Sequence, residues 1–254
     1  MGQLRRIFVN HFELARKSRG LGFALTMYPV VFAIASIKHV LRELDGGFEF
    51  DRIHGTDTST PVDIFTLTAA HEGPRISYSA SIPVRTAQEI IAALEGMPEN
   101  WQTFTWLDLG SGKGRSIMVA SALPLDRIVG IELSPECHEI AQRNLRRYRP
   151  PEQRCHNMDV RLLDATQYAI PEQDTVIFVF NSFGPKIWST VFGNIRTSYE
   201  SHPRKMYLIH AGGPVAYYQR SLRECGFLRR VHSNERLGFE IYGSRECAAG
   251  NAGR

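Results

Sequence analysis

Short apolar segments alternate with amphipathic helical segments in the second half of the chain, and this alternation constrains the fold more than any other feature. Five strands are predicted, over residues 103–110, 127–133, 159–165, 174–180 and 205–211. Helices are predicted between them and ahead of the first, over residues 84–97, 115–123, 134–148, 186–200 and 215–225. Nearly continuous apolar strands that alternate with helices are typical of a parallel sheet with helices on both faces. Segments 227–233 and 238–244 are predicted to add an antiparallel hairpin at one edge, so the sequence predicts an α/β, mostly parallel sheet.

The first third of the chain has a different pattern. Residues 1 to about 45 are predicted to form helices, and the polar stretch over residues 51–67 is predicted to be a loop. We therefore expect an N-terminal helical extension and polar loop over residues 1–77, a main domain over 78–246 and a flexible tail over 247–254.

Residues 20–37 contain no charged side chain, and basic residues precede them. The length is close to the roughly 18 apolar residues that a membrane helix requires. Pro29, Thr26 and two glycines weaken that interpretation and favour a helix-packing element. Membrane association through residues 20–37 is the alternative.

Composition excludes several classes of protein. Hydrophobic residues make up 43% of the 254, which supports a large core, and the net charge of +4 is too small to indicate nucleic-acid binding by itself. No stripe of basic and aromatic residues suggests a nucleic-acid surface either. The four cysteines form no CxxC pair and no zinc spacing, so we expect free thiols, no metal site and a cytoplasmic location.

The stretch WLDLGSGKGRS, residues 106–116, is a glycine-rich turn directly after a predicted strand. It lacks the GK[ST] ending of a phosphate-binding P-loop, and Arg115 replaces the third glycine of a dinucleotide motif. A turn with Gly110, Gly112 and Gly114 lets the backbone approach a compact group that carries no phosphate. Lys113, between two of these glycines, is expected to be exposed.

Polar residues end the next three predicted strands. Glu132 ends the second, where a carboxylate can accept hydrogen bonds from both hydroxyls of a ribose. Asp164 and Ala165 end the third, where an acid can accept the amine of adenine and a small residue leaves room for the ring. Asn181 follows the fourth and is predicted to face the ligand crevice of an open α/β sheet.

These motifs together resemble those of class I S-adenosylmethionine (SAM) methyltransferases. The likeness covers about residues 78–244, and DLGSGKGR followed by GIELSP carries it. It implies a Rossmann-like domain that binds SAM. Glu132 would hold the ribose, and Asp164 and Ala165 would lie at the adenine. The methionine end of SAM would be lined by Asp108, Gly110, Ser111, Gly112 and Gly114.

A narrower resemblance rests on FDRIHGTDTS, YSAS and NSFG, at residues 50–59, 78–81 and 181–184. It is to an uncharacterised bacterial group of such enzymes that is distantly similar to SET-less lysine methyltransferases. It implies that Tyr78 and Ser81 lie in a loop ahead of the helix that leads to the glycine turn. Related enzymes carry Asn-Pro-Phe where this chain has Asn-Ser-Phe, so the loop after the fourth strand is expected to be less rigid.

The resemblance implies methyl transfer to a nitrogen or oxygen acceptor, either a protein lysine or a small metabolite. The candidate residues for the acceptor side are Asn181, Tyr78 and Asp57, with His54 and His210 as further candidates for a base. Two alternatives remain open: an NAD-dependent oxidoreductase, and a SAM-binding module without catalytic activity.

Overall fold

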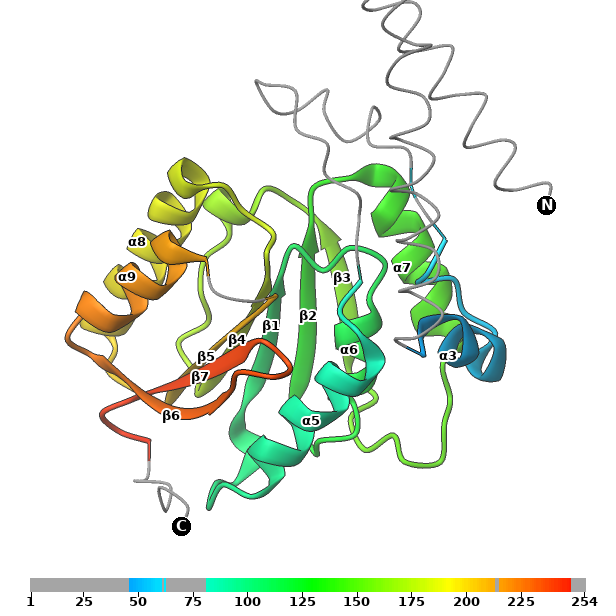
Figure 1. Ribbon diagram of the computed structural model, residues 1–254, viewed down its shortest axis with the longest axis horizontal. Coiled ribbons are helices and arrows are strands. Elements are labelled where there is room, and N and C mark those ends of the chain that lie inside the picture. The colour runs from blue at the N-terminus through cyan, green and yellow to red at the C-terminus, as the bar shows by residue number, and fades with distance from the viewer. Residues whose placement is uncertain (1–45, 61, 63–80, 213–214, 248–254) are drawn as a thin grey trace, which may run out of the picture. The chain divides into compact units, whose positions relative to one another are not determined.

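The computed structural model describes residues 46–60, 62, 81–212 and 215–247 (Figure 1). The chain divides into two compact units, Met1–Gly46 and Gly47–Arg254, and every helix and strand given below lies in the second. The predictions for residues 1–45, for Tyr78, for the boundary at residue 77 and for the end of the tail fall outside the described residues.

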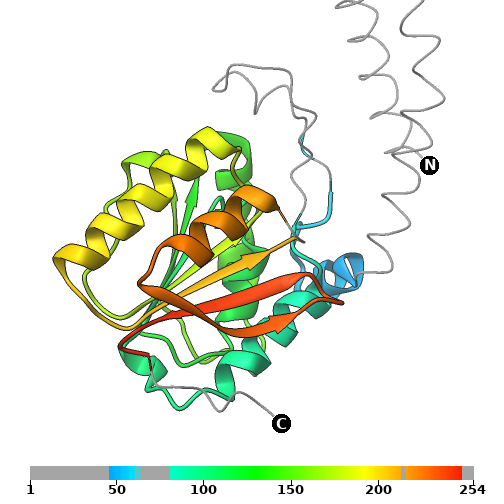
Figure 2. The same ribbon diagram turned by 60° about the vertical axis from the view of Figure 1, so that its left-hand side comes forward.

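A single seven-stranded sheet forms the centre of the second unit (Figures 1 and 2). The strand order is β3-β2-β1-β4-β5-β7-β6, with β1 to β5 parallel to one another and β7 antiparallel to both β5 and β6. The α/β fold and the antiparallel C-terminal pair are therefore confirmed. The strand bounds are β1 Thr105–Leu109, β2 Arg127–Glu132, β3 Met158–Leu162, β4 Thr175–Phe180, β5 Met206–Ala211, β6 Leu228–Asn234 and β7 Phe239–Ser244.

Helices cover both faces of this sheet, and each face has its own apolar cluster. Trp106 of β1 packs with one set of helices, whereas Leu107 and Leu109 pack with the other, as the period of two in a strand requires. The first set is α5 Val84–Glu95, α6 Arg115–Ala120 and α7 Pro135–Arg147, and the second is α8 Pro185–Ser201 and α9 Ala216–Glu224 (Figure 1).

Helix α7 begins where its sequence indicates. The Ser134 hydroxyl accepts a hydrogen bond from the backbone N–H of Cys137 at 3.2 Å, and Pro135 occupies the first turn. This start fixes α7 directly after β2, so the polar end of β2 lies beside the glycine turn that follows β1.

Two of the predicted boundaries that are wrong concern candidate site residues. The expected loop over residues 51–67 begins inside a helix, α3 Gly47–His54, because Phe50 is buried and its ring stacks on Tyr148 with centroids 5.8 Å apart. His54, a candidate base, packs against the same Tyr148 ring at 4.8 Å. The third strand ends at Leu162 rather than at 165, since Ala165 begins a short 3₁₀ helix, η3 Ala165–Gln167. The other 3₁₀ helix, η2, spans Trp101–Thr103.

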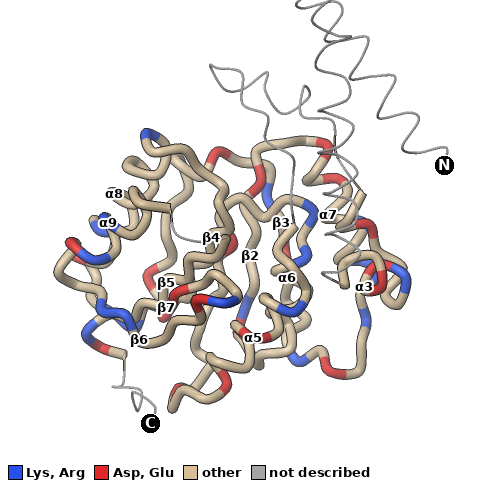
Figure 3. The backbone as a smooth tube through the Cα atoms, in the orientation of Figure 1, with Lys and Arg blue, Asp and Glu red and all other residues tan. Residues whose placement is uncertain are grey.

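The remaining general expectations concern thiols, charge and membrane. All four cysteines are free, as expected. Basic and acidic side chains are interspersed along the described backbone (Figure 3), which agrees with the absence of a strong charge pattern in the sequence. Among the described residues, no helix combines the length and the apolar character that crossing a bilayer requires.

Candidate functional site

The glycine turn connects the end of β1 to the start of α6. Gly110, Gly112 and Gly114 all have positive φ, at 84°, 54° and 84°. The backbone N–H groups of Gly110 and Ser111 donate to the carbonyl of Ile131 at 2.9 and 3.0 Å, which anchors the turn to β2. Residues other than glycine adopt these backbone angles only at a cost in free energy.

Gly110 also lies against the loop that follows β4. A Cβ atom built on Gly110 would lie 2.4 Å from the Cβ of Ser182, far inside van der Waals contact. The Ser182 hydroxyl in turn lies 3.5 Å from the carbonyl of Gly110. Glycine is therefore required here both by φ and by the close approach of the NSFG loop, residues 181–184.

A cavity with about 300 Å³ of empty space lies against the turn. Part of this space is open to solvent. The Ser111 hydroxyl is buried there without a hydrogen-bond partner, although buried hydroxyls normally have one. A polar ligand in the cavity would supply that partner. The lining residues are Ser81, Ile82, Asp108, Gly110, Ser111, Gly112, Arg115, Ser116, Phe178 and Phe180.

Asp108 contributes a carboxylate to this cavity from β1. It is 1% exposed, and burial raises its pKa to about 7, with a further contribution from the negative charge of Glu132. A hydrogen bond from the hydroxyl of Ser116 opposes this rise. A buried acid with only one stabilising partner is suited to receive a cationic group of a ligand.

Glu132 lies at the end of β2, next to the turn. Its two carboxylate oxygens accept one backbone N–H each, from Gly112 at 2.8 Å and from Ser134 at 2.7 Å. Burial raises its pKa, and these backbone hydrogen bonds act in the opposite direction. Each oxygen has a second lone pair, so the carboxylate can still accept hydrogen bonds from two ligand hydroxyls.

Asp164 and Ala165 lie at the end of the neighbouring strand. One carboxylate oxygen of Asp164 accepts hydrogen bonds from the backbone N–H and the hydroxyl of Thr166, each at 2.8 Å. This is the capping of η3, and Ala165 is buried directly behind it. Parallel pairing of β2 with β3 places Glu132 opposite Leu162, so Asp164 follows at the same edge of the sheet.

Asn181 follows β4 with a positive φ of 49°, and it is the only described residue other than glycine with such a value. Its amide donates to the carbonyl of Gly212 at 2.9 Å, which ties the loop after β4 to the loop after β5. The same loop is held from α9, because the hydroxyls of Tyr217 and Tyr218 donate to the carbonyl of Phe183 at 2.6 and 3.1 Å. These hydrogen bonds connect the NSFG loop to the loop after β5 and to α9.

His210, a second candidate base, lies on β5 and packs against α9. Its ring stacks on Tyr218 with centroids 4.4 Å apart, and burial lowers its pKa to about 4. It is therefore neutral at pH 7. It is not among the described residues that line the cavity.

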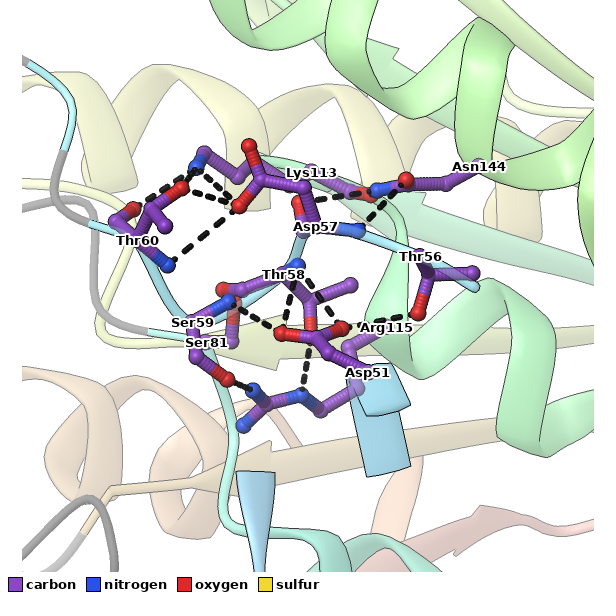
Figure 4. A network of polar contacts seen from close by, with 10 residues as sticks. All are labelled: Asp51, Thr56, Asp57, Thr58, Ser59, Thr60, Ser81, Lys113, Arg115 and Asn144. Atoms are coloured by element: carbon purple, nitrogen blue, oxygen red, sulfur yellow. Dashed lines mark hydrogen bonds and ion pairs between the residues drawn. The ribbon is translucent and has the colours of Figure 1, made fainter. Parts of the chain in front are cut away.

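The prediction that Lys113 is exposed is wrong. The residue is 2% exposed, and its ammonium donates to the Asp57 carboxylate at 3.1 Å and to the carbonyl and hydroxyl of Thr60 at 2.6 and 2.7 Å (Figure 4). Burial lowers the pKa of Lys113, and the charge of Asp57 offsets part of this. Asp57, predicted for the acceptor side, is thus the partner of a buried lysine. It is not among the described residues that line the cavity.

Sequence reasoning missed five residues of the site, and Ile82, which lines the cavity from the segment ahead of α5, is one of them. Ser116 pairs with Asp108, Arg115 faces the cavity, and Phe178 and Phe180 line it from β4. The period of two in β4 was a usable signal, because it places both phenylalanines on the face that Asp108 occupies in β1. Across the described residues, no group of three or more potential ligand side chains is placed to hold a metal ion.

Comparisons with known proteins were made on sequence and on structure. No protein-family model matches the sequence, and a search of curated proteins found no match. Similar solved structures include magnesium protoporphyrin IX methyltransferase from Synechocystis PCC 6803 with bound SAM, at 13% identity and a TM-score of 0.46, with 82% of this chain and 95% of that chain covered. Another is a SAM-dependent methyltransferase from Leishmania major, at 15% identity and a TM-score of 0.44, with coverage of 64% and 71%. A third is an RNA methyltransferase from Salinibacter ruber in complex with S-adenosyl-L-homocysteine, at 18% identity and a TM-score of 0.41, with coverage of 66% and 95%. At these identities and scores the function has to be inferred from the residues of the site.

Proposed function

We propose that this protein is a SAM-dependent methyltransferase that acts on a nitrogen or oxygen acceptor, either a protein lysine or a small metabolite. The observation that carries the proposal is the convergence of two carboxylates on one glycine turn. Asp108 lies on one side of the turn inside the cavity, and Glu132 binds the backbone of Gly112 on the other. SAM has a cationic amine at one end and a ribose diol in the middle, so it matches this pair of acids.

The residues present fit SAM in chemistry and in order along the sheet edge. Asp108 would accept hydrogen bonds from the methionine amine, and the unpartnered hydroxyl of Ser111 would bind the same end. Glu132 would accept hydrogen bonds from the ribose hydroxyls. Asp164 and Ala165, after the next strand, would lie at the adenine. All five of these residues were predicted from the sequence.

When bound, SAM supplies an electrophilic methyl group, and the protein supplies orientation and a dry site. Phe178 and Phe180, with Ile82, are the apolar part of the cavity wall and would exclude water from the reacting end. Asn181 follows β4 at the same edge, and we keep it as the residue that orients the acceptor. Its side-chain amide already donates to Gly212, so its carbonyl oxygen is the group for an acceptor N–H or O–H.

The alternative of an NAD-dependent oxidoreductase requires room for a pyrophosphate at the turn. Lys113 and Arg115 are the two cations there, and both are engaged by residues 57–60 rather than directed at an open phosphate site. Buried cations that already have hydrogen-bond partners do not attract a phosphate strongly. This observation favours SAM over a dinucleotide.

Substitution of Glu132 tests the proposal. Glu132→Ala is expected to weaken SAM binding by about 1 to 3 kcal/mol, because two charge-assisted hydrogen bonds are lost. Glu132→Gln keeps the shape and one acceptor oxygen, so it is expected to lose less. Calorimetric titration of both variants with SAM measures the difference, with circular dichroism as the check on folding. Unchanged affinity in the folded alanine variant would contradict the assignment of Glu132.

The acceptor is identified separately. Purified protein and SAM labelled in the methyl group are incubated with cell extract from a strain that lacks the gene. Label in a protein band indicates a protein lysine or another side chain, whereas label in the small-molecule fraction indicates a metabolite. Binding of SAM without transfer to either fraction would support the non-catalytic module instead.

A further inference from the structure

Lys113 in the glycine turn and Arg115 at the start of α6 are buried cations, although lysine and arginine are rarely buried without partners. Lys113 is 2% exposed and Arg115 is 3% exposed. Removing such charges from water costs several kcal/mol unless hydrogen bonds replace the water. Both have partners in residues 56–60, which we call the TDTST loop, more than 50 residues earlier in the sequence (Figure 4).

Arg115 binds the TDTST loop and the segment ahead of α5 at the same time. Its guanidinium donates to the Thr58 hydroxyl at 2.8 Å, to the Ser59 hydroxyl at 2.6 Å and to the carbonyl of Ile82 at 2.9 Å. A planar guanidinium presents several N–H groups in fixed directions, and lysine cannot reproduce this geometry. Arg115 also lines the cavity, so the same side chain touches the ligand space and its surroundings.

Asp51 of α3 holds the backbone of the TDTST loop in place through hydrogen bonds. The Asp51 carboxylate accepts hydrogen bonds from the backbone N–H groups of Thr58 and Ser59, at 2.9 and 2.8 Å, and from the hydroxyls of Thr56 and Thr58. These contacts give the loop a defined backbone, which presents the hydroxyls of Thr58 and Ser59 to Arg115.

Asn144 of α7 joins the loop to the turn from the other side. Its side chain forms a pair of hydrogen bonds with the backbone of Asp57, accepting from the N–H at 2.8 Å and donating to the carbonyl at 3.0 Å. It also donates to the carbonyl of Lys113 at 2.9 Å. Asn144 is 1% exposed, so these are contacts of a buried polar group that has found its partners.

The loop reaches the cavity wall through Thr58. The Ser81 hydroxyl donates to the carbonyl of Thr58 at 2.6 Å, and Ser81 and Ile82 line the cavity beside Asp108 and Gly112. The position of this wall therefore depends on the TDTST loop and on Arg115.

We propose that Arg115 and Lys113 are positioning residues that clamp the TDTST loop and the Ser81–Ile82 wall onto the glycine turn. Order in the loop and ligand binding in the cavity are then coupled. The identity of the ligand rests on the proposed function, whereas the clamp itself does not. The ordered loop and the bound ligand stabilise each other, because a ligand that binds only the clamped form shifts the protein toward that form.

Hydrogen exchange on the full chain tests the clamp in two variants and one control. Arg115→Lys keeps the charge and loses the planar guanidinium. Thr58→Val keeps the volume and loses the hydroxyl that accepts from Arg115 and donates to Asp51, so it removes one contact to Arg115 together with one contact to Asp51. The control is Arg147→Lys, because Arg147 is exposed and its guanidinium donates to the carbonyl of Gly55 at 3.2 Å, outside the TDTST loop. The amides of Thr58 and Ser59 are expected to exchange about tenfold faster in both variants than in the wild type and the control.

Coupling to the ligand is tested in the same samples with SAM. In the wild type and in Arg147→Lys, SAM is expected to slow exchange of these two amides. In Arg115→Lys and Thr58→Val, we expect this protection to be lost and SAM affinity, measured by calorimetry, to fall about tenfold. A merely structural role of Arg115 would lower the melting temperature without changing the affinity of the folded protein, and that result would overturn the proposal.

The two proposals fail in different ways. If the wild type binds no SAM, the proposed function fails, and exchange in the ligand-free samples still decides on the clamp. If Arg115→Lys does not fold, Thr58→Val carries the test. Unchanged exchange of Thr58 and Ser59 in a folded variant overturns the clamp.

Discussion

Replacing Asp108 by asparagine is expected to weaken SAM binding about 100-fold and, at the same time, to stabilise the ligand-free protein at pH 7.5 (about one half unit above the pKa). The affinity falls because a charge-assisted hydrogen bond to the methionine amine is lost. The stability rises because a carboxylate at 1% exposure is replaced by a neutral group.

The direction of the stability change follows from the raised pKa of Asp108, which burial moves from 3.8 to about 7. A raised pKa means that the carboxyl group favours the folded state below pH 3.8 and loses this contribution as the pH rises through 7. A change of this size corresponds to about 4 kcal/mol, and we expect about half of it to be recovered, because the buried amide keeps N–H groups without partners.

SAM binding by the wild type should depend on pH for the same reason. A cationic amine beside Asp108 favours the ionised carboxylate, so binding releases a proton from the protonated fraction. Affinity is then expected to fall by up to about tenfold for each pH unit below 7, and to level off above it. In Asp108→Asn this dependence should disappear.

Calorimetric titrations between about pH 5.5 and pH 7.5, together with thermal melts of the ligand-free protein, measure these effects. Asp174→Asn is the matched control, because Asp174 accepts hydrogen bonds from Thr103 and Lys205 and lies outside the cavity lining. Wild-type affinity in the Asp108 variant, or a lower melting temperature at pH 7.5 with no other change, would contradict the role given to Asp108.

Replacing Gly110 by alanine is expected to abolish detectable SAM binding and to lower the free energy of unfolding by about 3 kcal/mol or more. Two costs add. A residue with a side chain at a φ of 84° is strained, and its Cβ would lie 2.4 Å from the Cβ of Ser182. The NSFG loop must therefore move, although Tyr217 and Tyr218 hold it through Phe183.

Gly226→Ala separates the two costs. Gly226 has a φ of 74°, and a Cβ there would meet nothing within 4 Å. It is expected to lose only the conformational part, about 1 kcal/mol. Urea denaturation of both variants gives the difference. Equal losses would mean that the approach of Ser182 to Gly110 is not a real constraint.

The sequence allowed prediction of those parts of the site that depend on nearby positions. Gly110, Glu132 and Asp164 each lie at the end of a predicted strand, and parallel strands bring such ends to one edge of the sheet. The period of two in a strand would also have placed Phe178 and Phe180 on the face of the sheet that Asp108 occupies. The sheet and its hairpin follow from the alternation of apolar segments, for which no distant partner has to be known.

Burial of charges could not be predicted in this way. Lys113 stands between two glycines in a turn, where most lysines are exposed. Its burial depends on Asp57 and Thr60, more than 50 residues earlier, and no local pattern reports that contact. The same holds for Asp57, which as an isolated polar residue is a reasonable candidate for catalysis. Its position beside Lys113 became visible only once the loop was placed on the turn.

Titration of the wild-type protein with SAM, in parallel with NADH, tests the central claim most directly. The full chain is titrated by calorimetry near pH 7.5, above the pKa of about 7 at Asp108, with folding checked by circular dichroism. We predict saturable binding of SAM with one site for each chain and no binding of NADH. A folded protein that binds NADH, or that does not bind SAM at all, would contradict the account.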